Sequence, residues 1–329
     1  MEFKLHAPFK LSAEGESVLL CDGEGRALCG VELPALKSDQ AYSRLEDGSY
    51  TADLAPTPGL PNSEQSAAAL RAQVTQGNTS GVYINELMAS EKSRPHDWLE
   101  VYNASSQAAD ISGWGLSDDA ASPRKYRFPQ GTVIAPGDHL TLYLSGTDGV
   151  DASGILHASF GLSADGGYGL TLSDASGALL DRVFVPEQYT GISYARMNDG
   201  GFLYTTEDTP DRMNAQTGYQ GRTQAPAFSI PGGPQAEGST LQVELTAAPG
   251  ARIFYTLDCS APDETDAPYT GPIAVTGTTV VRAVAYQEGY LPSYSASQSY
   301  LYDAEHTLRV VSMVADPEDI FGPEGFHTL

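Results

Sequence analysis

Few side chains in this chain have the type and spacing that catalysis or metal binding needs. Six histidines are scattered along it, and no two have the i, i+4 spacing of a metal-binding pair on a helix. They are His6, His96, His139, His157, His306 and His327. We find no GxxxxGK[ST] or GxGxxG phosphate loop and no nucleophile elbow. We therefore expect structural or solvated histidines, and we predict no catalytic, cofactor-binding or metal-binding residue.

Acidic residues gather at three places where they could bind calcium, which prefers several converging oxygen ligands. The groups are Asp118-Asp119, Glu318-Asp319, and the cluster of Asp263, Glu264 and Asp266. Acidic residues in turns are mostly solvent-exposed, so solvated turns are the favoured interpretation. Loop Ca²⁺ stays as the alternative, and no other cofactor is expected.

Aromatic residues raise the question of sugar stacking. Trp98 and Trp114 each lie in a strand-like run with apolar neighbours, which favours a place in a core. Tyr286, Tyr290 and Tyr294 cluster near an expected loop, where they either form a stacking platform or pack within a small sandwich. We favour packing for all five.

The negative charge of the chain argues against polyanionic partners. The 329 residues include 18 Lys+Arg and 42 Asp+Glu, giving a formal net charge of −24. Nucleic acids and anionic lipid surfaces both select basic proteins. Arg124, Lys125 and Arg127 form a small basic cluster beside Asp118 and Asp119, too small to overcome that repulsion. No apolar run reaches the ~18 residues of a membrane span, so we expect neither nucleic-acid binding nor membrane insertion.

Lysine is confined to the first part of the chain. The five lysines are Lys4, Lys10, Lys37, Lys92 and Lys125. Residues 126–329 therefore have no lysine for a nucleophile, a Schiff base or a phosphate clamp.

An internal repeat organises the first two thirds of the chain. Leu5 to Gly15 recurs as Leu156 to Gly166, an offset of 151, and from Asp22 and Asp174 onward the offset is 152. The matches continue to Asn62 and Asn214. Chance does not keep such a register over nearly 60 residues.

Both copies have the pattern of strands and turns. Residues 169–172 and 179–185 flank a Ser-Asp-Ala-Ser-Gly loop, which predicts a hairpin, and residues 18–21 and 27–31 repeat it. His139 to Leu144 alternates with period two, as a half-buried strand should. The Ala-rich stretch from Glu64 to Val74 is expected to be a linker with one or two helical turns.

The repeat is unequal. A well-patterned β segment, residues 81–155, precedes the second copy, whereas four residues precede the first. We expect residues 1–62 to be the C-terminal half of a sandwich, in a fragment of a longer protein. Cys21 and Cys29 end the two arms of its hairpin and could form a disulfide. Their counterparts Ser173 and Asp181 show that the fold does not need one.

Residues 81–217 resemble the lamin-tail domain family, whose members are immunoglobulin-like β-sandwiches. The resemblance rests on residues 82–89, 97–103, 110–118, 126–129 and 132–137, and on Thr209, Pro210 and Asn214. It implies an accessory module of the kind found in large secreted or surface proteins of bacteria. Asp211 stands where the first copy has Gly59, so a different terminal turn is expected.

Residues 226–302 resemble the chitobiase/β-hexosaminidase C-terminal-type domain, another small β-sandwich. The matching segments are residues 228–233, 253–258, 269–273 and 279–285. Cys259 replaces the glycine of the family's Thr-x-Asp-Gly-Ser turn, which puts that turn in doubt, since cysteine does not readily adopt a positive φ. The module is an appendage of its enzymes, so the resemblance implies no glycosidase activity.

Residues 306–317 and 320–325 resemble the opening strand of spore-coat protein H (CotH)-like kinases, with Leu308-Arg309-Val310 in place of Leu-Pro-Val. The sequence stops before any phosphoryl-transfer residue of that family.

We therefore predict an all-β chain of tandem immunoglobulin-like β-sandwiches. The expected parts are a half-domain at 1–62, a linker at 63–80, a complete lamin-tail-like domain at 81–217, a linker at 218–225, a second sandwich at 226–302 and a truncated kinase-like start at 303–329. We expect a monomeric, non-catalytic structural or adhesion segment of a secreted or cell-surface bacterial protein, presenting the kinase-like domain and meeting protein or glycan. Carbohydrate-binding accessory modules are the alternative.

Overall fold

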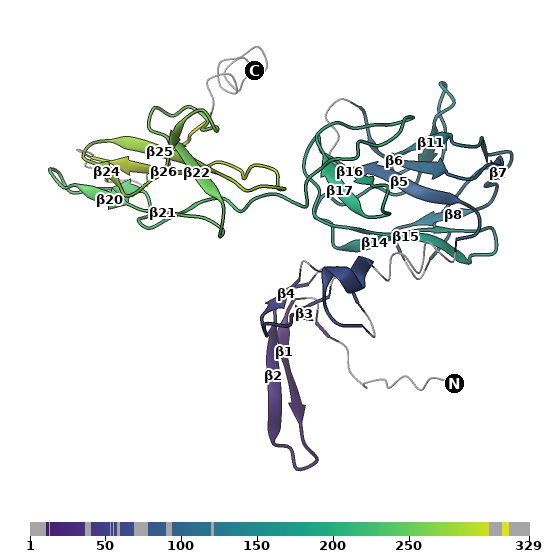
Figure 1. Cartoon of the computed structure of the whole chain (residues 1–329), viewed down its shortest axis with the longest axis horizontal. Coiled ribbons are helices and arrows are strands. Elements are labelled where there is room, and N and C mark those ends of the chain that lie inside the picture. Colours follow the sequence, from purple (N-terminus) through teal and green to yellow (C-terminus); the bar gives the residue numbers. More distant parts are fainter. Residues whose placement is uncertain are drawn as a thin grey trace. The chain divides into compact units, whose positions relative to one another are not determined.

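The computed structural model describes residues 11–12, 14–36, 41–52, 54, 56–57, 60–68, 78–89, 94–119, 122–302 and 311–315. It is nearly all β, and the helix within these residues is one short segment at 64–68. The chain divides into two compact units, residues 1–218 and 219–329 (Figure 1). The predicted class, all-β with tandem immunoglobulin-like sandwiches, is confirmed.

The helical segment agrees with the expected one or two turns after Glu64, and residues 69–74 of that stretch lie outside the described residues. Within the described part of the chain, no helix has the length and apolar character to cross a membrane.

The chain begins with two small antiparallel pairs, the first of which is the predicted hairpin. Strands β1 (Glu16–Cys21) and β2 (Ala27–Leu33) form it, and β3 (Ser43–Arg44) pairs with β4 (Tyr50–Thr51). No third strand of the described residues joins either pair.

Residues 78–217 form a sandwich of two main sheets (Figure 1). The larger sheet has the order β12-β13-β11-β6-β5-β16-β17. Its strands are β5 (Val82–Met88), β6 (Asp97–Asn103), β11 (His139–Leu144), β12 (Gly149–Val150), β13 (Leu156–Ala158), β16 (Ser193–Arg196) and β17 (Phe202–Thr205). The second sheet, β15-β14-β8-β9, contains β8 (Gly115–Ser117), β9 (Tyr126–Arg127), β14 (Tyr168–Ser173) and β15 (Leu179–Val185). A short pair joins β7 (Ala109–Asp110) to β10 (Val133–Ile134).

One apolar core fills the space between these sheets. Leu170 and Leu172 of β14 and Ile84 and Leu87 of β5 all belong to this core, and all four are fully buried. The hairpin predicted from residues 169–172 and 179–185 is confirmed as β14–β15, and the strand predicted at 139–144 is confirmed as β11.

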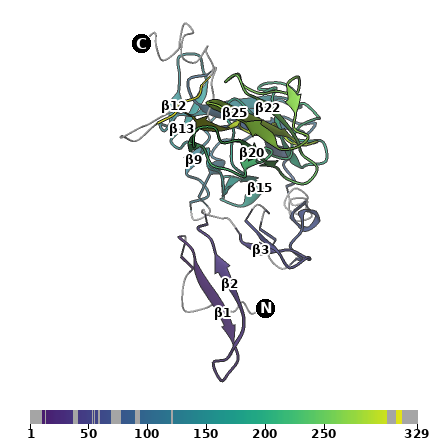
Figure 2. The same ribbon diagram turned by 90° about the vertical axis from the view of Figure 1, so that its left-hand side faces the viewer.

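The second unit, whose strands β20, β22 and β25 are labelled in Figure 2, is a smaller sandwich. Its five-stranded sheet, β19-β26-β25-β22-β23, contains β19 (Gly233–Pro234), β22 (Arg252–Thr256), β23 (Ala267–Pro268), β25 (Thr279–Tyr286) and β26 (Ala296–Leu301). Two further pairs join β18 (Ala227–Phe228) to β21 (Leu245–Thr246) and β20 (Leu241–Val243) to β24 (Ile273–Val275). Val281, Ala283 and Tyr300 lie in its core.

Among the residues that the structure describes, two non-glycine residues have a positive φ, and both are positions where the sequence departs from a glycine. Asp211 has φ 62° and Cys259 has φ 70°. Cys259 therefore adopts a left-handed conformation in place of the family's glycine, which answers the doubt raised above about its turn. Gly59, the counterpart of Asp211 in the first copy, lies outside the described residues, and the expected difference between the two terminal turns stays a prediction.

Replacing Cys259 with glycine is expected to stabilise the second unit by about 1 kcal/mol. The left-handed conformation is strained for cysteine, and glycine relieves that strain while adding some freedom to the unfolded chain. The Cys259 carbonyl, which accepts a hydrogen bond from Arg282 at 2.7 Å, is unchanged. Urea unfolding of Cys259→Gly beside Cys259→Ser, which keeps the strain, measures the effect. Equal stability of the two variants would contradict it.

Candidate functional site

The most deeply buried acids of the first unit lie side by side on β5 and β6. Glu86 and Glu100 are register partners, and neither side chain is exposed. Asn85 is the extra residue of a β-bulge beside them, and such bulges re-aim side chains. Together with Thr209 and Asn214 these residues form what we call the buried acidic cluster.

Glu86 is held entirely by hydroxyl and amide donors. Its carboxylate accepts hydrogen bonds from Ser193 Oγ at 2.5 Å, from Thr209 Oγ1 at 2.8 Å and from the Thr209 backbone N–H at 3.1 Å. Burial nevertheless raises the pKa of Glu86 above its usual value, because the ionised form loses its hydration.

Glu100 accepts hydrogen bonds from Asn85 Nδ2 at 2.6 Å and from the Asp211 backbone N–H at 2.5 Å. Burial raises the pKa of Glu100 to about 7, the nearby Glu86 charge adds to the rise, and the Asn85 hydrogen bond opposes it. His139 Nε2 lies 3.9 Å from this carboxylate, but burial lowers the pKa of His139 and so weakens any ion pair.

Asn214 completes the cluster by crossing to β5. Its Oδ1 accepts from Asn85 Nδ2 at 2.8 Å and from Thr209 Oγ1 at 3.3 Å. Its Nδ2 donates to the carbonyls of Asn85 at 3.1 Å and of Arg196 at 2.9 Å. The cluster thus fastens the chain after β17 to β5 and β6. Its acids are enclosed and engaged by donors of the fold, so the arrangement suits stabilisation rather than proton transfer to a substrate.

The Glu100 environment predicts a stability that falls as pH rises. A carboxyl with a folded pKa near 7 and an ordinary value of 4.5 contributes its full stabilisation below pH 4.5 and loses it as the pH rises to 7. The loss is about 3 kcal/mol. Glu100→Gln is expected to reduce the difference in unfolding free energy between pH 5 and pH 7.5. The control Glu207→Gln changes an exposed acid. An unchanged pH difference in Glu100→Gln would contradict the account.

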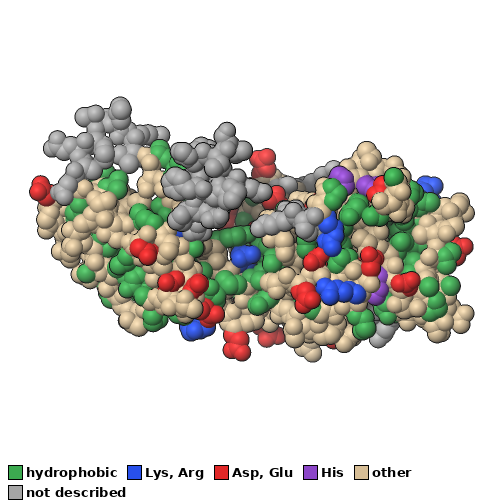
Figure 3. All heavy atoms as spheres, turned by 90° about the horizontal axis from the view of Figure 1, so that it is seen from above, with side chains coloured by type: hydrophobic (Ala, Val, Ile, Leu, Met, Phe, Trp, Pro, Cys, Tyr) green, Lys and Arg blue, Asp and Glu red, His purple; other side chains and the backbone are tan. Residues whose placement is uncertain are grey.

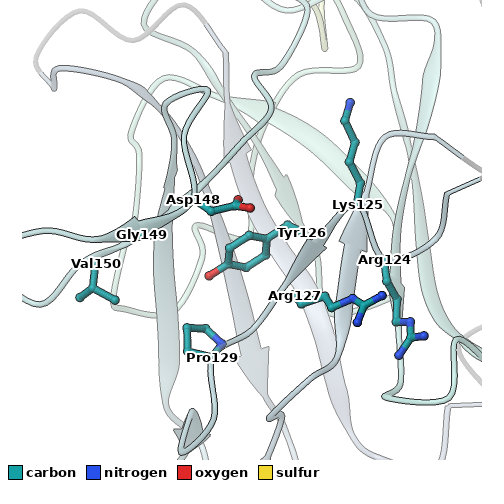
Figure 4. Close-up of a pocket in the computed structure, with 8 residues that line it drawn as sticks. All are labelled: Arg124, Lys125, Tyr126, Arg127, Pro129, Asp148, Gly149 and Val150. Atoms are coloured by element: carbon teal, nitrogen blue, oxygen red, sulfur yellow. The ribbon is translucent and has the colours of Figure 1, made fainter.

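A surface pocket of about 440 Å³ lies along the basic cluster predicted from the sequence (Figure 4). It is lined by Arg124, Lys125, Tyr126, Arg127, Pro129, Asp148, Gly149 and Val150. The Arg124, Lys125 and Arg127 side chains extend away from the Tyr126 ring rather than converging beside it (Figure 4). Burial raises the pKa of Tyr126 to about 12, so its hydroxyl stays protonated.

Two of the three cations make local contacts. Lys125 Nζ pairs with Asp118 at 2.8 Å, and Arg124 donates to the Ala175 carbonyl. In Figure 3 the blue Lys and Arg side chains lie in small separate groups, several of them beside red Asp or Glu side chains. The cluster therefore presents no set of cations aimed at one point.

The described histidines pack against aromatic rings. His96, Tyr143 and His157 form a cluster with ring centroids 5.5–5.9 Å apart, and His139 stacks on Tyr102 at 4.6 Å. His157 Nδ1 also lies 2.8 Å from Ser145 Oγ. Aromatic packing of these three agrees with a structural role, which stays a prediction, while His6, His306 and His327 lie outside the described residues.

The acidic groups proposed as calcium ligands do not converge where they are described. Asp263 accepts from the Thr265 backbone N–H at 2.7 Å and from Thr265 Oγ1 at 2.6 Å, and Glu264 pairs with Arg252. No group of three or more His, Cys, Asp or Glu side chains in the described ranges is placed to hold a metal ion. Glu318 and Asp319 lie outside those ranges.

The tryptophans occupy the predicted core positions. Trp98 is fully buried, and Trp114 is partly buried against the core of the first sandwich. The three tyrosines do not behave alike. Tyr286 packs its ring against the edge of Phe254 at 5.7 Å, in agreement with the favoured interpretation.

Tyr294 is instead 60% exposed, with the Arg222 guanidinium 4.3 Å from its ring centroid. Tyr290 is half-buried and its hydroxyl donates to Gln220 at 3.2 Å. Packing inside the sandwich is therefore wrong for Tyr294, because the loop after Leu291 holds its ring at the surface.

The three cysteines are free thiols, and all are exposed. In the β1–β2 ladder Cys29 lies opposite Leu20, whereas Cys21 lies opposite Ala27 beyond a bulge. Cys21 and Cys29 are therefore not register partners, and the possible disulfide between them is not formed in this structure.

Comparisons with protein families agree with this architecture. Residues 75–186 match the family model of the Lamin Tail Domain, and residues 231–297 match that of the Chitobiase/beta-hexosaminidase C-terminal domain. No curated protein matches the chain. Among solved structures it is similar to fibronectin(III)-like modules of Clostridium thermocellum CbhA. The identity is 10%, with 70% of this chain and all of that chain covered, at a TM-score of 0.18.

The fold and the two family matches thus define a protein built from immunoglobulin-like modules. One module carries a lamin-tail match and the other a chitobiase-type match. Both were anticipated from the sequence.

Sequence reasoning missed the buried acidic cluster. Thr209 and Asn214 were noted as repeat markers, and Asn85, Glu86 and Glu100 only as parts of a family pattern. Two signals could have found it. Glutamates interrupt otherwise buried strand sequences, and buried acids need partners. The repeated Thr and Asn supply such donors.

Proposed function

We propose that this chain is a non-catalytic structural or adhesion segment of a larger secreted or cell-surface bacterial protein. The observation that carries the proposal is that its buried acids bind donors of the fold itself. Glu86 and Glu100 are enclosed in a sandwich and held by donors of the fold, and they serve as fasteners between β5, β6 and the chain after β17. Rigid modules of this kind suit spacing and presentation of neighbouring domains.

Residues 303–329 concern the domain that such a segment would present. The resemblance of residues 303–329 to the start of a CotH-like kinase stays a prediction, because residues 303–310 and 316–329 lie outside the described part. The described residues 311–315 contain neither helix nor strand.

We also propose protein or neutral glycan, rather than nucleic acid, as the surface partner. The net charge of −24 and the dispersed cations around Arg124 support it. A titration of labelled duplex DNA at about 150 mM salt, followed by fluorescence anisotropy, is expected to show no binding. Micromolar binding that weakens in Arg124→Ala and Arg127→Ala would overturn this part of the proposal.

Carbohydrate binding is the second candidate function, and the exposed ring of Tyr294 favours it. Exposed aromatic rings stack on sugar faces, and the matched module type is appended to sugar-cleaving enzymes. Arg222 already stacks on Tyr294, which argues against an open platform. A glycan array separates the two candidates. Binding that is lost in Tyr294→Ala and kept in Tyr50→Ala, an exposed tyrosine of the other unit, would favour the glycan function.

The purified chain is expected to show no turnover of ATP or of chromogenic glycosides above a protein-free blank. Glycosidases need two carboxylates across a sugar cleft, and kinases need metal-binding acids with a phosphate-positioning cation. Turnover that a single substitution in the chain abolishes would contradict the non-catalytic assignment.

A further inference from the structure

The first copy of the repeat reproduces side-chain contacts of the second. Three pairs correspond: Thr57 to Thr209, Asn62 to Asn214, and Arg44 to Arg196. In each copy the threonine hydroxyl donates to the asparagine side chain, at 2.8 and 3.3 Å. The asparagine Nδ2 then donates to the arginine carbonyl, at 3.0 and 2.9 Å. The repeat is therefore one of structure as well as sequence.

The hairpins correspond equally closely. The ladder shifts register between Leu20 and Cys21 in the first copy and between Leu172 and Ser173 in the second. Further along, the equivalent ring pairs Tyr42–Tyr50 and Tyr194–Phe202 have centroids 5.2 and 5.1 Å apart. The described residues between 11 and 62 thus resemble one half of a complete sandwich in their strand pairing and side-chain contacts.

The two copies differ in the solvent exposure of their hairpin side chains. Leu20 is 60% exposed, whereas its counterpart Leu172 is fully buried. Cys21 and Cys29 are exposed, whereas Ser173 and Asp181 are at most 1% exposed. A two-stranded ribbon with exposed leucines on it is marginally stable in water.

The interface within the complete copy shows what covers such a half. β8 pairs with the edge of β14, and residues of β5, β6 and β11 pack on the apolar face of β14 and β15. These covering strands all lie within residues 78–155. Several polar contacts cross this interface, and one dipeptide of β5 supplies two of them, since Glu86 binds Thr209 and Asn85 binds Asn214.

We propose that residues 11–62 are the acceptor half of a split immunoglobulin-like sandwich. The partner is a polypeptide half of the same kind as residues 78–155, with an Asn-Glu dipeptide that docks on Asn62 and Thr57. Residues 78–155 of a second copy are already closed on residues 156–217, so their docking would require opening a folded core. A glycan or lipid has no strand to pair with the hairpin edges.

The exposed thiols allow a direct test. Residues 78–155 are placed ahead of Leu5 in the full chain, in place of residues 1–4, which repeats the natural junction of residue 155 with Leu156. Site-resolved labelling with a maleimide is read by mass spectrometry. Docking is expected to slow labelling of Cys21 and Cys29 by about a hundredfold, since only transient opening then exposes them. Cys259 of the second unit, also exposed, is the internal control and keeps its rate.

Two further variants calibrate the result. Ser173→Cys in the unmodified chain places a thiol at the buried counterpart of Cys21 and shows the rate of a closed sandwich. In the fusion, the double substitution Cys29→Asp with Ala41→Ser gives the acceptor half the residue types that the complete copy has at Asp181 and Ser193. The labelling rate of Cys21 then reports docking. Protection of Cys21 in either fusion, lost on Thr57→Val with Asn62→Ala, supports the proposal. Labelling of Cys21 as fast as Cys259 in both fusions would overturn it.

Discussion

Replacing Arg196 with methionine is expected to destabilise the first sandwich by about 3–5 kcal/mol. Arg196 pairs with the buried Asp181 carboxylate, and its side chain is 13% exposed. Removing one member of a buried ion pair leaves the other charge buried without a partner, and this loss strongly lowers the free energy of unfolding. Methionine keeps the apolar volume between the Tyr83 and Phe202 rings on which the guanidinium lies. Urea unfolding followed by near-UV circular dichroism measures the change.

Arg44→Met is the matched control for this substitution. Arg44 is the repeat equivalent of Arg196, but Cys29 stands where the second copy has Asp181, so no buried carboxylate depends on it. We expect a change below about 0.5 kcal/mol, as for ordinary surface substitutions. Equal destabilisation by the two variants would show that the ion pair is not what stabilises the complete copy.

Leu172→Ala is expected to destabilise the same sandwich by about 2–5 kcal/mol, because it opens a cavity in a closed core. Leu172 is fully buried among strands of both sheets. Its repeat equivalent Leu20 is 60% exposed, so Leu20→Ala is expected to change stability by less than about 0.5 kcal/mol. The same unfolding experiment compares the two.

A large loss of stability in Leu20→Ala would contradict this prediction. A loss near 2 kcal/mol there would mean that the β1–β2 face is already covered, and the distinction between an open and a closed copy would fail. Leu180→Ala, at a half-buried position outside the core cluster, serves as a background control.

The class of fold and the main strands were predictable because they depend on local patterns. The alternation of His139–Leu144 and the Asp174–Gly177 turn of the β14–β15 hairpin both act over a few neighbours in sequence. The inequality of the repeat was also visible, since residues 81–155 have no counterpart ahead of the first copy.

The buried acidic cluster was not predictable in the same way. Glu86 and Thr209 are separated by 123 residues, so their contact depends on how β5 meets the chain after β17. The positive φ of Cys259 likewise depends on contacts of its turn, among them the hydrogen bond from Arg282 to its carbonyl. Cysteine at that position gave reason to doubt the turn, and the tertiary contacts outweigh the local preference.

Amide hydrogen exchange on the unmodified chain tests most directly whether one copy is open and the other closed. The account predicts that the β14–β15 amides, between Tyr168 and Val185, exchange through unfolding of the whole sandwich. The equivalent β1–β2 amides, between Glu16 and Leu33, should exchange about a thousandfold faster, as in a hairpin without a core. Equal, strong protection of both hairpins would contradict the account, because it would show that residues 11–62 already belong to a closed core.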